Sequence, residues 1–361
     1  MTTPPIDDVT VEIYRFPTPQ TEADGTLSWD ATTAVVVSIR AGRETGLGWT
    51  YSSPAAATVV ECELASLLSG TSPSHVTDTW RRLRRACRNV GTPGVVGHAL
   101  SAVDIALWDL TARLLRVPLA TLFCSGGRAT PVYGSGGFVN LTDEQLAEQV
   151  AGWQAAGCAA VKIKIGVDAE RDLERIALVR RLAGSRIDIM VDANGAYTPG
   201  QARRVGTELD RLGVVWFEEP VTSDDLPGLR AVRDAVGCDV TAGEYVYSAY
   251  EAERLIDVVD CLQLDITRCG GYTGFLRAAA IAASEHRDIS AHCAPALHAG
   301  IAAAVPRLRH IEWFVDHARL EPLLVTGAPE VVAGCIAPRG AEADPYGHGM
   351  RLSERAAPYR I

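Results

Sequence analysis

From Pro131 onward, short apolar segments alternate with amphipathic ones, and this alternation restricts the possible folds more than any other feature of the chain. Eight apolar segments predict strands, and six amphipathic segments between them predict helices. The strands are expected to begin near Pro131, Ala160, Ile187, Val214, Asp239, Cys261, Asp288 and His310, and the helices to span residues 142–156, 170–182, 199–212, 226–236, 249–258 and 273–284. Repeated strand–helix units form a parallel sheet, and eight of them predict an α/β fold closed into a (β/α) barrel, a modified TIM barrel.

An open doubly wound sheet is the main structural alternative. Such a sheet usually shows a GxGxxG motif after its first strand or a Walker loop, and the sequence contains neither in that position. The barrel is therefore the favoured prediction.

The first third of the chain has a different pattern, which predicts an α+β unit. Residues 9–15 and 34–40 are β-branched runs, and the second leads into a glycine-rich turn before Trp49. Apolar residues at spacings of three and four predict helices over residues 55–68, 75–89 and 97–115. Pro118 and the Gly126–Gly127 pair then indicate a boundary, so we expect one domain over residues 1–125 and a barrel over residues 126–320.

Composition excludes several classes of protein. An apolar share of 47% and a charged share of 22% fit a globular core and argue against disorder. With a net charge of −10, the chain is a poor candidate for binding nucleic acid or an anionic membrane surface. No signal peptide and no run of roughly 18 apolar residues is evident, so we expect a soluble, cytoplasmic protein.

The nine cysteines are odd in number and scattered, and no two form a CxxC pair. This pattern predicts reduced, mostly buried thiols and neither a disulfide framework nor a zinc site. They are Cys62, Cys87, Cys124, Cys158, Cys238, Cys261, Cys269, Cys293 and Cys335.

The chain contains 34 basic residues, and all of them except Lys162 and Lys164 are arginines. A lysine kept in so arginine-rich a chain suggests a role for an ammonium that can lose its proton, which arginine cannot do. The two side chains are two positions apart, so they point to the same side of the predicted strand. Burial and mutual repulsion allow one of them to be neutral near pH 7 and to serve as a base, while nearby carboxylates and a metal would oppose that shift.

Seven consecutive predicted strands, from the second to the eighth, end in ionisable residues. One acidic residue at a strand end is usually a helix cap or a turn residue. Seven strands in register are different, because charges gathered at a buried rim are costly unless they are paired or bind a metal. The residues are Lys162, Lys164, Asp192, Glu218, Glu244, Asp265, His292 and Glu312.

The types of these residues indicate their chemistry. Asp192, Glu218 and Glu244 form an all-oxygen set that suits a hard cation, and Mg²⁺ is expected in preference to zinc. Asp265 is placed to hold and polarise His292, which would give a second acid/base group with a fixed tautomer. A lysine on one side, a His–Asp pair on the other and a metal between them predict removal of a proton next to a carboxylate.

Longer motifs resemble those of the enolase superfamily, in particular its mandelate racemase subgroup. One is the segment 99–110 (ALSAVDIALWDL), which Ala112-Arg113, Pro118-Leu119 and Leu122-Phe123 follow. Another is Asp192-Ala-Asn194 with the later Glu218-Glu219-Pro220, and a third is the segment 265–271 (DITRCGG). The sequence departs from the first motif at Cys124, where a glycine is usual. The resemblance covers nearly the whole chain and implies an N-terminal capping domain that a C-terminal segment, residues 321–361, completes.

The resemblance also implies roles for the residues at the strand ends. Lys164 would be one base, His292 with Asp265 the opposing acid/base pair, and Glu312 a donor to the enediolate oxygen, although Asp316 and His317 lie close enough for the register to slip. The metal ligands would be Asp192, Glu218 and Glu244, and not Glu219. Lys162 would contact the substrate carboxylate or tune its neighbour Lys164, and Asn194 would assist near the metal or the substrate. Superfamily sites of this kind, with a Lys or His base and Mg²⁺, are a known pattern.

Proton abstraction leaves the second half of the reaction open. Return of the proton to the other face would be racemisation or epimerisation of a 2-hydroxy acid, whereas loss of a β-hydroxyl would be dehydration of an acid sugar. Loops over residues 18–30 and 48–53, with Trp49 and Tyr51 as substrate contacts, are polar and favour the dehydratase. A non-catalytic metal-binding barrel is a remote alternative. The expected partners are a small carboxylate substrate and, by resemblance, further copies of the chain.

Overall fold

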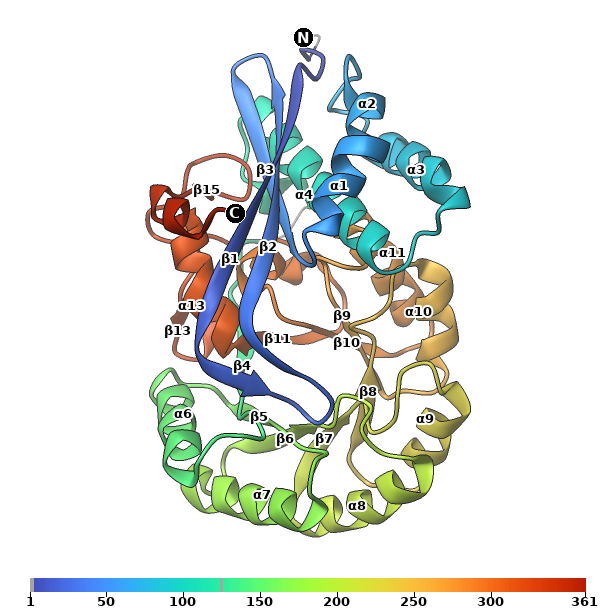
Figure 1. Cartoon of the computed structure of the whole chain (residues 1–361), viewed down its shortest axis with the longest axis vertical. Coiled ribbons are helices and arrows are strands. Elements are labelled where there is room, and N and C mark those ends of the chain that lie inside the picture. Colours follow the sequence, from blue (N-terminus) through green and yellow to red (C-terminus); the bar gives the residue numbers. More distant parts are fainter. Residues whose placement is uncertain (1–2, 124–125) are drawn as a thin grey trace.

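The computed structural model describes residues 3–123 and 126–361, and it shows a closed parallel barrel beneath an antiparallel cap (Figure 1). The barrel strands follow chain order, and the last pairs with the first in parallel, so the sheet closes. They are β4 (Thr130–Gly136), β5 (Ala160–Lys164), β6 (Asp188–Asp192), β7 (Val214–Glu218), β8 (Asp239–Ala242), β9 (Cys261–Leu264), β10 (Asp288–Ala291) and β11 (Leu308–Phe314). The eight-stranded barrel predicted from the sequence is confirmed.

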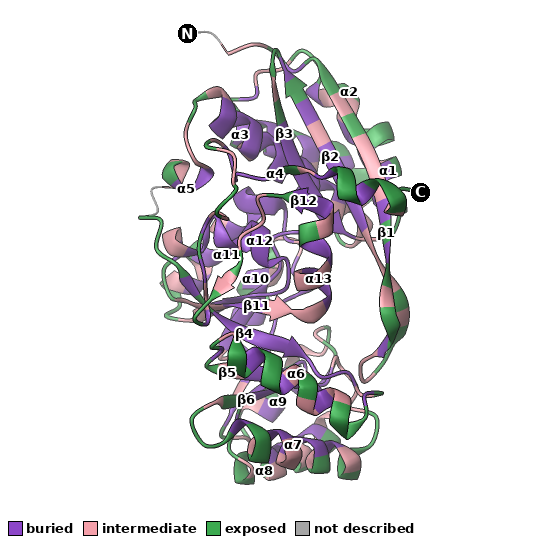
Figure 2. Ribbon diagram, turned by 90° about the vertical axis from the view of Figure 1, so that its left-hand side faces the viewer, coloured by how far each residue is buried: buried purple, intermediate pink, exposed green. Residues whose placement is uncertain are grey.

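A helix follows each barrel strand, and local capping explains where several of them begin. Thr142 and Thr198 each open a capping box with a glutamine three residues later, and the Asp168 carboxylate accepts two backbone N–H groups. Apolar sides of the helices pack on the strands, and the outer faces of α6, α7 and α8 are exposed (Figure 2). The helices are α6 (Asp143–Ala155), α7 (Ala169–Ala183), α8 (Pro199–Arg211), α9 (Leu226–Arg233), α10 (Ala249–Ile256), α11 (Gly271–Ser284), α12 (Pro295–Ala299) and α13 (Val315–Leu324).

The cap packs a three-stranded antiparallel sheet on helices. Gly46 and Gly48 lie against α4, where a Cβ would come within 2.2 Å of the carbonyl oxygens of Ala106 and Ala102, so only glycine fits. The predicted helix over residues 55–68 is broken by a π-helical turn at Val60–Leu64. The elements are β1 (Asp8–Ala23), β2 (Ser28–Ala41), β3 (Glu44–Tyr51), α1 (Ala55–Val59), α2 (Ala65–Leu68), α3 (Val76–Ala86), α4 (Val95–Leu114) and α5 (Leu119–Leu122).

Helix α4 has the length and apolarity of a membrane span, but its setting is that of a core helix. In its most apolar window, 78% of the residues are buried inside the molecule, against β3 and the other cap helices. Its hydrophobicity therefore serves the core of the cap.

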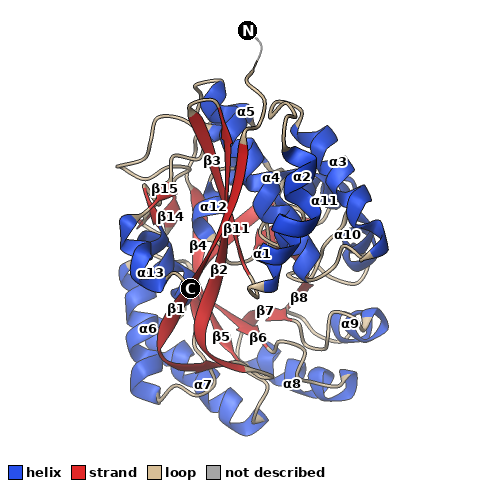
Figure 3. Ribbon diagram, turned by 45° about the horizontal axis from the view of Figure 1, so that its top comes forward, coloured by secondary structure: helices blue, strands red, loops and turns tan. Residues whose placement is uncertain are grey.

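The segment 18–30 was expected to be a loop. It forms the end of a long β-hairpin arm that β1 and β2 make, including the turn between them. The arm leaves the cap and reaches the ends of β5 and β6 (Figure 3). At its turn, a Cβ on Gly25 would lie 2.6 Å from the carbonyl oxygen of Ile165 and 2.9 Å from that of Ala193. The loop prediction was wrong in secondary structure, but the segment does extend over the mouth of the barrel.

The C-terminal segment contacts both parts of the molecule. Strand β14 (Cys335–Ile336) pairs with β4 at the base of the barrel. Strand β13 (Val331–Val332) pairs with the other edge of β14. The chain end returns to the cap, where Ile361 N–H donates to the Ile13 carbonyl and Tyr359 packs on Phe16. The predicted boundary between residues 320 and 321 falls inside α13. The predicted boundary between residues 125 and 126 adjoins Cys124 and residue 125, which lie outside the described part of the chain. Both domain boundaries remain predictions.

Candidate active site

All eight ionisable residues predicted at the strand ends converge on one buried centre. Each side chain belongs to a residue that is at most 7% exposed. Lys162 and Lys164 alternate with the core residue Ile163 on β5, so both ammonium groups face the barrel interior. The register predicted from the strand pattern therefore brings these residues together.

Asp192, Glu218 and Glu244 end or follow three neighbouring strands, β6, β7 and β8. One oxygen from each lies within 4.8 Å of the other two, and all three residues are buried. Among the described residues, the Glu244 Oε2 atom accepts no hydrogen bond, although His292 Nε2 lies 3.3 Å away. Three converging carboxylates, one with a buried unpaired oxygen, fit a hard divalent cation such as Mg²⁺.

The lysines are paired with these carboxylates. Lys162 Nζ lies 2.7 Å from both oxygens of Glu218 and 2.8 Å from Glu312 Oε1, and Lys164 Nζ lies 2.5 Å from Asp192 Oδ2. Burial lowers the pKa of both lysines, but the carboxylates outweigh burial and raise it above the usual value. A neutral lysine stays a prediction, because the carboxylates that raise the pKa of both lysines are also the expected ligands of a cation.

His292, at the end of β10, is held on the opposite side of the triad. Its Nδ1 lies 2.9 Å from Asp265 Oδ2, and the other oxygen of Asp265 accepts N–H and O–H bonds from Thr267, each 2.7 Å long. The Asp265 carboxylate fixes the proton on Nδ1, which leaves Nε2 free, 3.3 Å from Glu244 Oε2. Burial lowers the pKa of His292, but Glu244 and Asp265 raise it above the usual value.

Glu312, and not Asp316 or His317, points from β11 into the centre. Its Oε1 accepts a 2.6 Å hydrogen bond from Ser135, and its Oε2 accepts one of 2.9 Å from the Cys293 N–H. Asp316 instead accepts a hydrogen bond from Thr32 on the hairpin arm. Burial raises the pKa of Glu312, but Lys162 and His292 hold it well below the usual value.

The predicted substrate contacts occupy different positions. Asn194 lies two residues after Asp192, past the end of β6. Its side-chain Oδ1 is buried and has no hydrogen-bond partner among the described residues. Trp49 is fully buried in the cap, where its Nε1–H donates to the Tyr51 hydroxyl, so the structure does not place it at an open surface. Tyr51 donates to Glu321 and stacks on His317 with ring centroids 3.7 Å apart, at the edge of the centre. Trp49 as a substrate contact stays a prediction, and in the structure its side chain supports Tyr51.

Several residues at the centre were not identified from the sequence. Arg268 lies 3.1 Å from Glu244 Oε1 and 3.3 Å from Asp265 Oδ2, and thus links the triad to the His–Asp pair. Its position three residues after Asp265 was the available signal. The sequence offered no such signal for Ser135 and Cys293, because their hydrogen bonds to Glu312 depend on local geometry at the strand ends.

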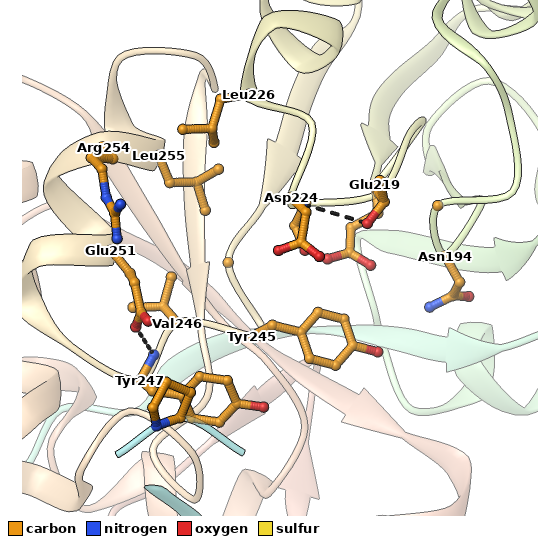
Figure 4. Close-up of a pocket in the computed structure, with 15 residues that line it drawn as sticks. Asn194, Glu219, Asp224, Leu226, Tyr245, Val246, Tyr247, Glu251, Arg254 and Leu255 are labelled. Carbon is orange, nitrogen blue, oxygen red and sulfur yellow. Dashed lines mark hydrogen bonds between the residues drawn. The ribbon is translucent and has the colours of Figure 1, made fainter. Parts of the chain in front are cut away.

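A cavity of about 690 Å³ opens beside the triad, outside the barrel centre (Figure 4). Its walls include Asn194, Glu219 and Tyr245, which lie within two residues of the triad's carboxylates along the chain. Glu219 lines this cavity and is not a member of the triad. Its Oε1 is buried and has no hydrogen-bond partner among the described residues. Lys164, His292 and Glu312 do not line this cavity.

An acid/base centre buried at the mouth of a capped barrel is typical of enzymes that transfer protons. A family model described as "Mandelate racemase / muconate lactonizing enzyme, N-terminal domain" matches residues 8–124, and one described as "Enolase C-terminal domain-like" matches residues 145–356. The chain belongs to the mandelate racemase/muconate lactonizing enzyme family of the enolase superfamily.

Known proteins resemble the chain over its full length. A 3,6-anhydro-alpha-L-galactonate cycloisomerase from Streptomyces coelicolor is 31% identical over 96% of this chain and 97% of its own. A mandelate racemase/muconate lactonizing enzyme-like protein from Rubrobacter xylanophilus has a solved structure that is 42% identical, with a TM-score of 0.95 over 99% of this chain and 100% of that one. L-talarate/galactarate dehydratase from Salmonella typhimurium, liganded with Mg and L-lyxarohydroxamate, is 28% identical, with a TM-score of 0.91 over 100% of this chain and 94% of that one.

Proposed function

We propose that the protein is a Mg²⁺-dependent dehydratase of acid sugars. It would remove the proton α to the carboxylate and expel a β-hydroxyl as water, giving a 2-keto acid. The observation that carries this proposal is the position of Lys164 and the His292–Asp265 pair at opposite ends of one carboxylate triad. The Salmonella dehydratase, a structural neighbour liganded with Mg, supports both the reaction and the metal.

Asp192, Glu218 and Glu244 would hold the cation, which supplies the positive charge that makes an α-proton of a carboxylate acidic. Lys162 Nζ lies 2.8 Å from Glu312 Oε1, and this ammonium would contact the substrate carboxylate. Lys162 would orient the substrate and donate hydrogen bonds as negative charge moves onto the carboxylate oxygen. Glu312, whose pKa is held well below the usual value, would accept from Lys162 and hold the ammonium in place, so it would not take the donor role expected from the sequence.

The proton steps use two groups. Lys164 Nζ or His292 Nε2 takes the proton from the α-carbon, and the C–H electron pair moves into the enediolate. As the enediolate collapses, the β C–O bond breaks, and an imidazolium at His292 gives its Nε2 proton to the leaving oxygen to form water. The enol that remains tautomerises to the 2-keto acid. Asp265 stays ionised throughout and stabilises the imidazolium.

An isomerase is the second candidate, and the Streptomyces relative, named a cycloisomerase, favours it. With an acid/base group on each side, the chain has what is needed to return the proton to carbon. Racemisation or epimerisation would use the same residues. A non-catalytic barrel is disfavoured, since the lysine, histidine and carboxylate set is complete.

A substrate screen separates these candidates. The protein with saturating Mg²⁺ is incubated with a panel of aldonic, aldaric and anhydro-sugar acids, and 2-keto acid and stereoisomers are measured. Keto-acid formation supports the dehydratase. Isomer formation without keto acid overturns the dehydratase in favour of the isomerase, and neither product from any acid contradicts both. A cytoplasmic location and a homo-oligomeric state remain predictions.

A further inference from the structure

We propose that His292, Cys293 and Glu312 form a second metal site, one that takes a thiophilic divalent cation such as Zn²⁺. These three residues offer a nitrogen, a sulfur and an oxygen ligand within 4.8 Å of one another, and all are buried. The site lies beside the triad, just after the end of β10 and on β11, with His292 Nε2 3.3 Å from Glu244 Oε2.

The spacing of the three donor atoms fits a small tetrahedral ion. Cys293 Sγ lies 3.4 Å from His292 Nε2 and 3.4 Å from Glu312 Oε2, and the last two atoms are 3.8 Å apart. Zinc bonds of about 2.0–2.3 Å in a tetrahedron place neighbouring ligand atoms roughly 3.4–3.6 Å apart. The three atoms therefore need little movement to occupy three corners.

The groups behind these donors orient them as ligands. Asp265 holds His292 Nδ1 at 2.9 Å, which directs the lone pair of Nε2 into the site, as carboxylates do behind zinc-binding histidines. Ser135 and Lys162 hold Glu312 Oε1, so Oε2 is the oxygen that faces the site. Both ligand side chains are thus fixed from behind by other residues.

The backbone at the end of β10 turns the thiol toward the centre. Cys293 and Ala294 have backbone φ values of +50° and +40°, which residues other than glycine rarely adopt. The Ala294 N–H donates to His317 Nδ1 at 3.0 Å, and the Cys293 N–H donates to Glu312. These two hydrogen bonds hold the turn and leave the sulfur beside His292 and Glu312.

The donor set distinguishes this site from the triad. Asp192, Glu218 and Glu244 offer oxygen alone, which suits Mg²⁺, whereas imidazole and thiolate select zinc and related ions. The thiol proton is released to solvent when the metal binds. Glu244 adds negative charge 3.3 Å from His292 Nε2, while the Lys162 ammonium next to Glu312 opposes the cation.

An ion here would occupy the lone pair that His292 needs as a base, so it would inhibit proton transfer without displacing Mg²⁺. This inhibitory consequence rests on the proposed function, whereas metal binding itself does not. The two are tested separately.

Binding is tested with Co²⁺ on the full-length protein at saturating Mg²⁺. A Co²⁺–thiolate bond gives a charge-transfer absorption band, which we expect for one equivalent of Co²⁺ and which Zn²⁺ should abolish. The band should disappear in both Cys293→Ser and Cys293→Ala and remain in Cys62→Ser, which removes an exposed thiol elsewhere. The absence of the band in the wild type, or its persistence in either Cys293 variant, would overturn the site.

Affinity and activity give independent readouts. Competition with a chromophoric chelator should show that Cys293→Ala weakens Zn²⁺ binding by at least about 100-fold, because removing even an outer partner of a ligand costs about 10–100-fold. Once a substrate is known, each variant is compared with its own zinc-free rate, and zinc should inhibit the wild type far more than Cys293→Ser. Equal inhibition of both would assign zinc to the triad and contradict the proposal. If no substrate is found, the Co²⁺ result still decides the site.

Discussion

The two lysines show how much a single position depends on its surroundings. Lys162 contacts Glu218 and Glu312, whereas Lys164 contacts Asp192 and lies at the triad's far end from His292. The carboxylates raise the pKa of both lysines, so Lys164 would give up its proton more readily when Asp192 has another positive partner. The chemistry of this residue is therefore a property of the whole centre.

Replacing Lys164 with arginine tests its role. Lys164→Arg keeps the positive charge beside Asp192 but removes a group that can give up its proton. We expect turnover to fall by about 10²–10⁴-fold, the usual contribution of a general acid or base. Initial rates on an identified sugar acid measure this, with circular dichroism as the check on folding. Full activity of the variant on both configurations at the α-carbon would exclude lysine as a base.

The His292–Asp265 pair makes a second prediction. Asp265→Asn leaves a hydrogen-bond partner at His292 Nδ1 but removes the charge that stabilises the imidazolium. We expect a fall in kcat of about 10²–10⁴-fold and a lower pKa in the kcat profile for His292. Thr267→Val, which removes one of the bonds to Asp265, is a control that should have a smaller effect. An unchanged pH profile in Asp265→Asn would contradict the assigned role.

At the scale of elements, the hairpin arm connects the cap to the mouth of the barrel, at the ends of β5 and β6. Gly25 sits so close to the carbonyl oxygens of Ile165 and Ala193 that a Cβ would approach within 2.6 Å of backbone. Gly25→Ala should therefore push the arm off the ends of β5 and β6 and raise KM with a small loss of stability. Steady-state kinetics and thermal unfolding measure both, with Gly152→Ala as control, since nothing lies within 4 Å of a Cβ there. Wild-type kinetics in Gly25→Ala would show that the arm does not cover the substrate.

Helix α4 of the cap is joined to α11 of the barrel by a buried carboxyl group. Asp104 accepts hydrogen bonds from the Thr273 N–H and hydroxyl, and burial raises its pKa from 3.8 to about 7. Because the folded pKa is above the unfolded one, the folded state binds this proton more tightly. Its stabilising effect is full below the unfolded pKa and is lost as the pH rises to about 7.

Asp104→Asn, which resembles the protonated carboxyl group at every pH, should remove this dependence. The stability of the wild type relative to the variant should fall by about 2 kcal/mol between pH of about 5.5 and about 8, since one pKa unit corresponds to about 1.4 kcal/mol. Denaturant unfolding at the two pH values measures it, with the exposed Asp78→Asn as control. A constant difference across the range would show that the proton is not taken up on folding.

The whole molecule shows which features the sequence carried and which it did not. The barrel and the positions of Asp192, Glu218 and Glu244 were predictable because strand and helix periods are local, and strand ends share one rim. The arm was not, because its polar residues resemble a loop and its strands form only through long-range pairing. The burial of Trp49 was not predictable either, because its contact with His348, far along the chain, leaves no local pattern in the sequence.

Removal of the metal is a prediction for the whole molecule. Treatment with a chelator should abolish product formation, and Mg²⁺ should restore it and raise the unfolding temperature, because a ligand that binds only the folded state stabilises it. Calorimetry with and without Mg²⁺ measures the shift, and Asp192→Asn should show a smaller one. An equal shift in the variant would place the cation elsewhere.

The central claim is that this centre removes a proton α to a carboxylate. Nuclear magnetic resonance in D₂O, with Mg²⁺ and the sugar-acid panel, follows the α-hydrogen directly. The account predicts that at least one acid loses its α-hydrogen signal to exchange or to keto-acid formation, and that Lys164→Arg or Asp265→Asn slows this loss. Retention of the α-hydrogen in every acid, by a folded protein with Mg²⁺ bound, would contradict it.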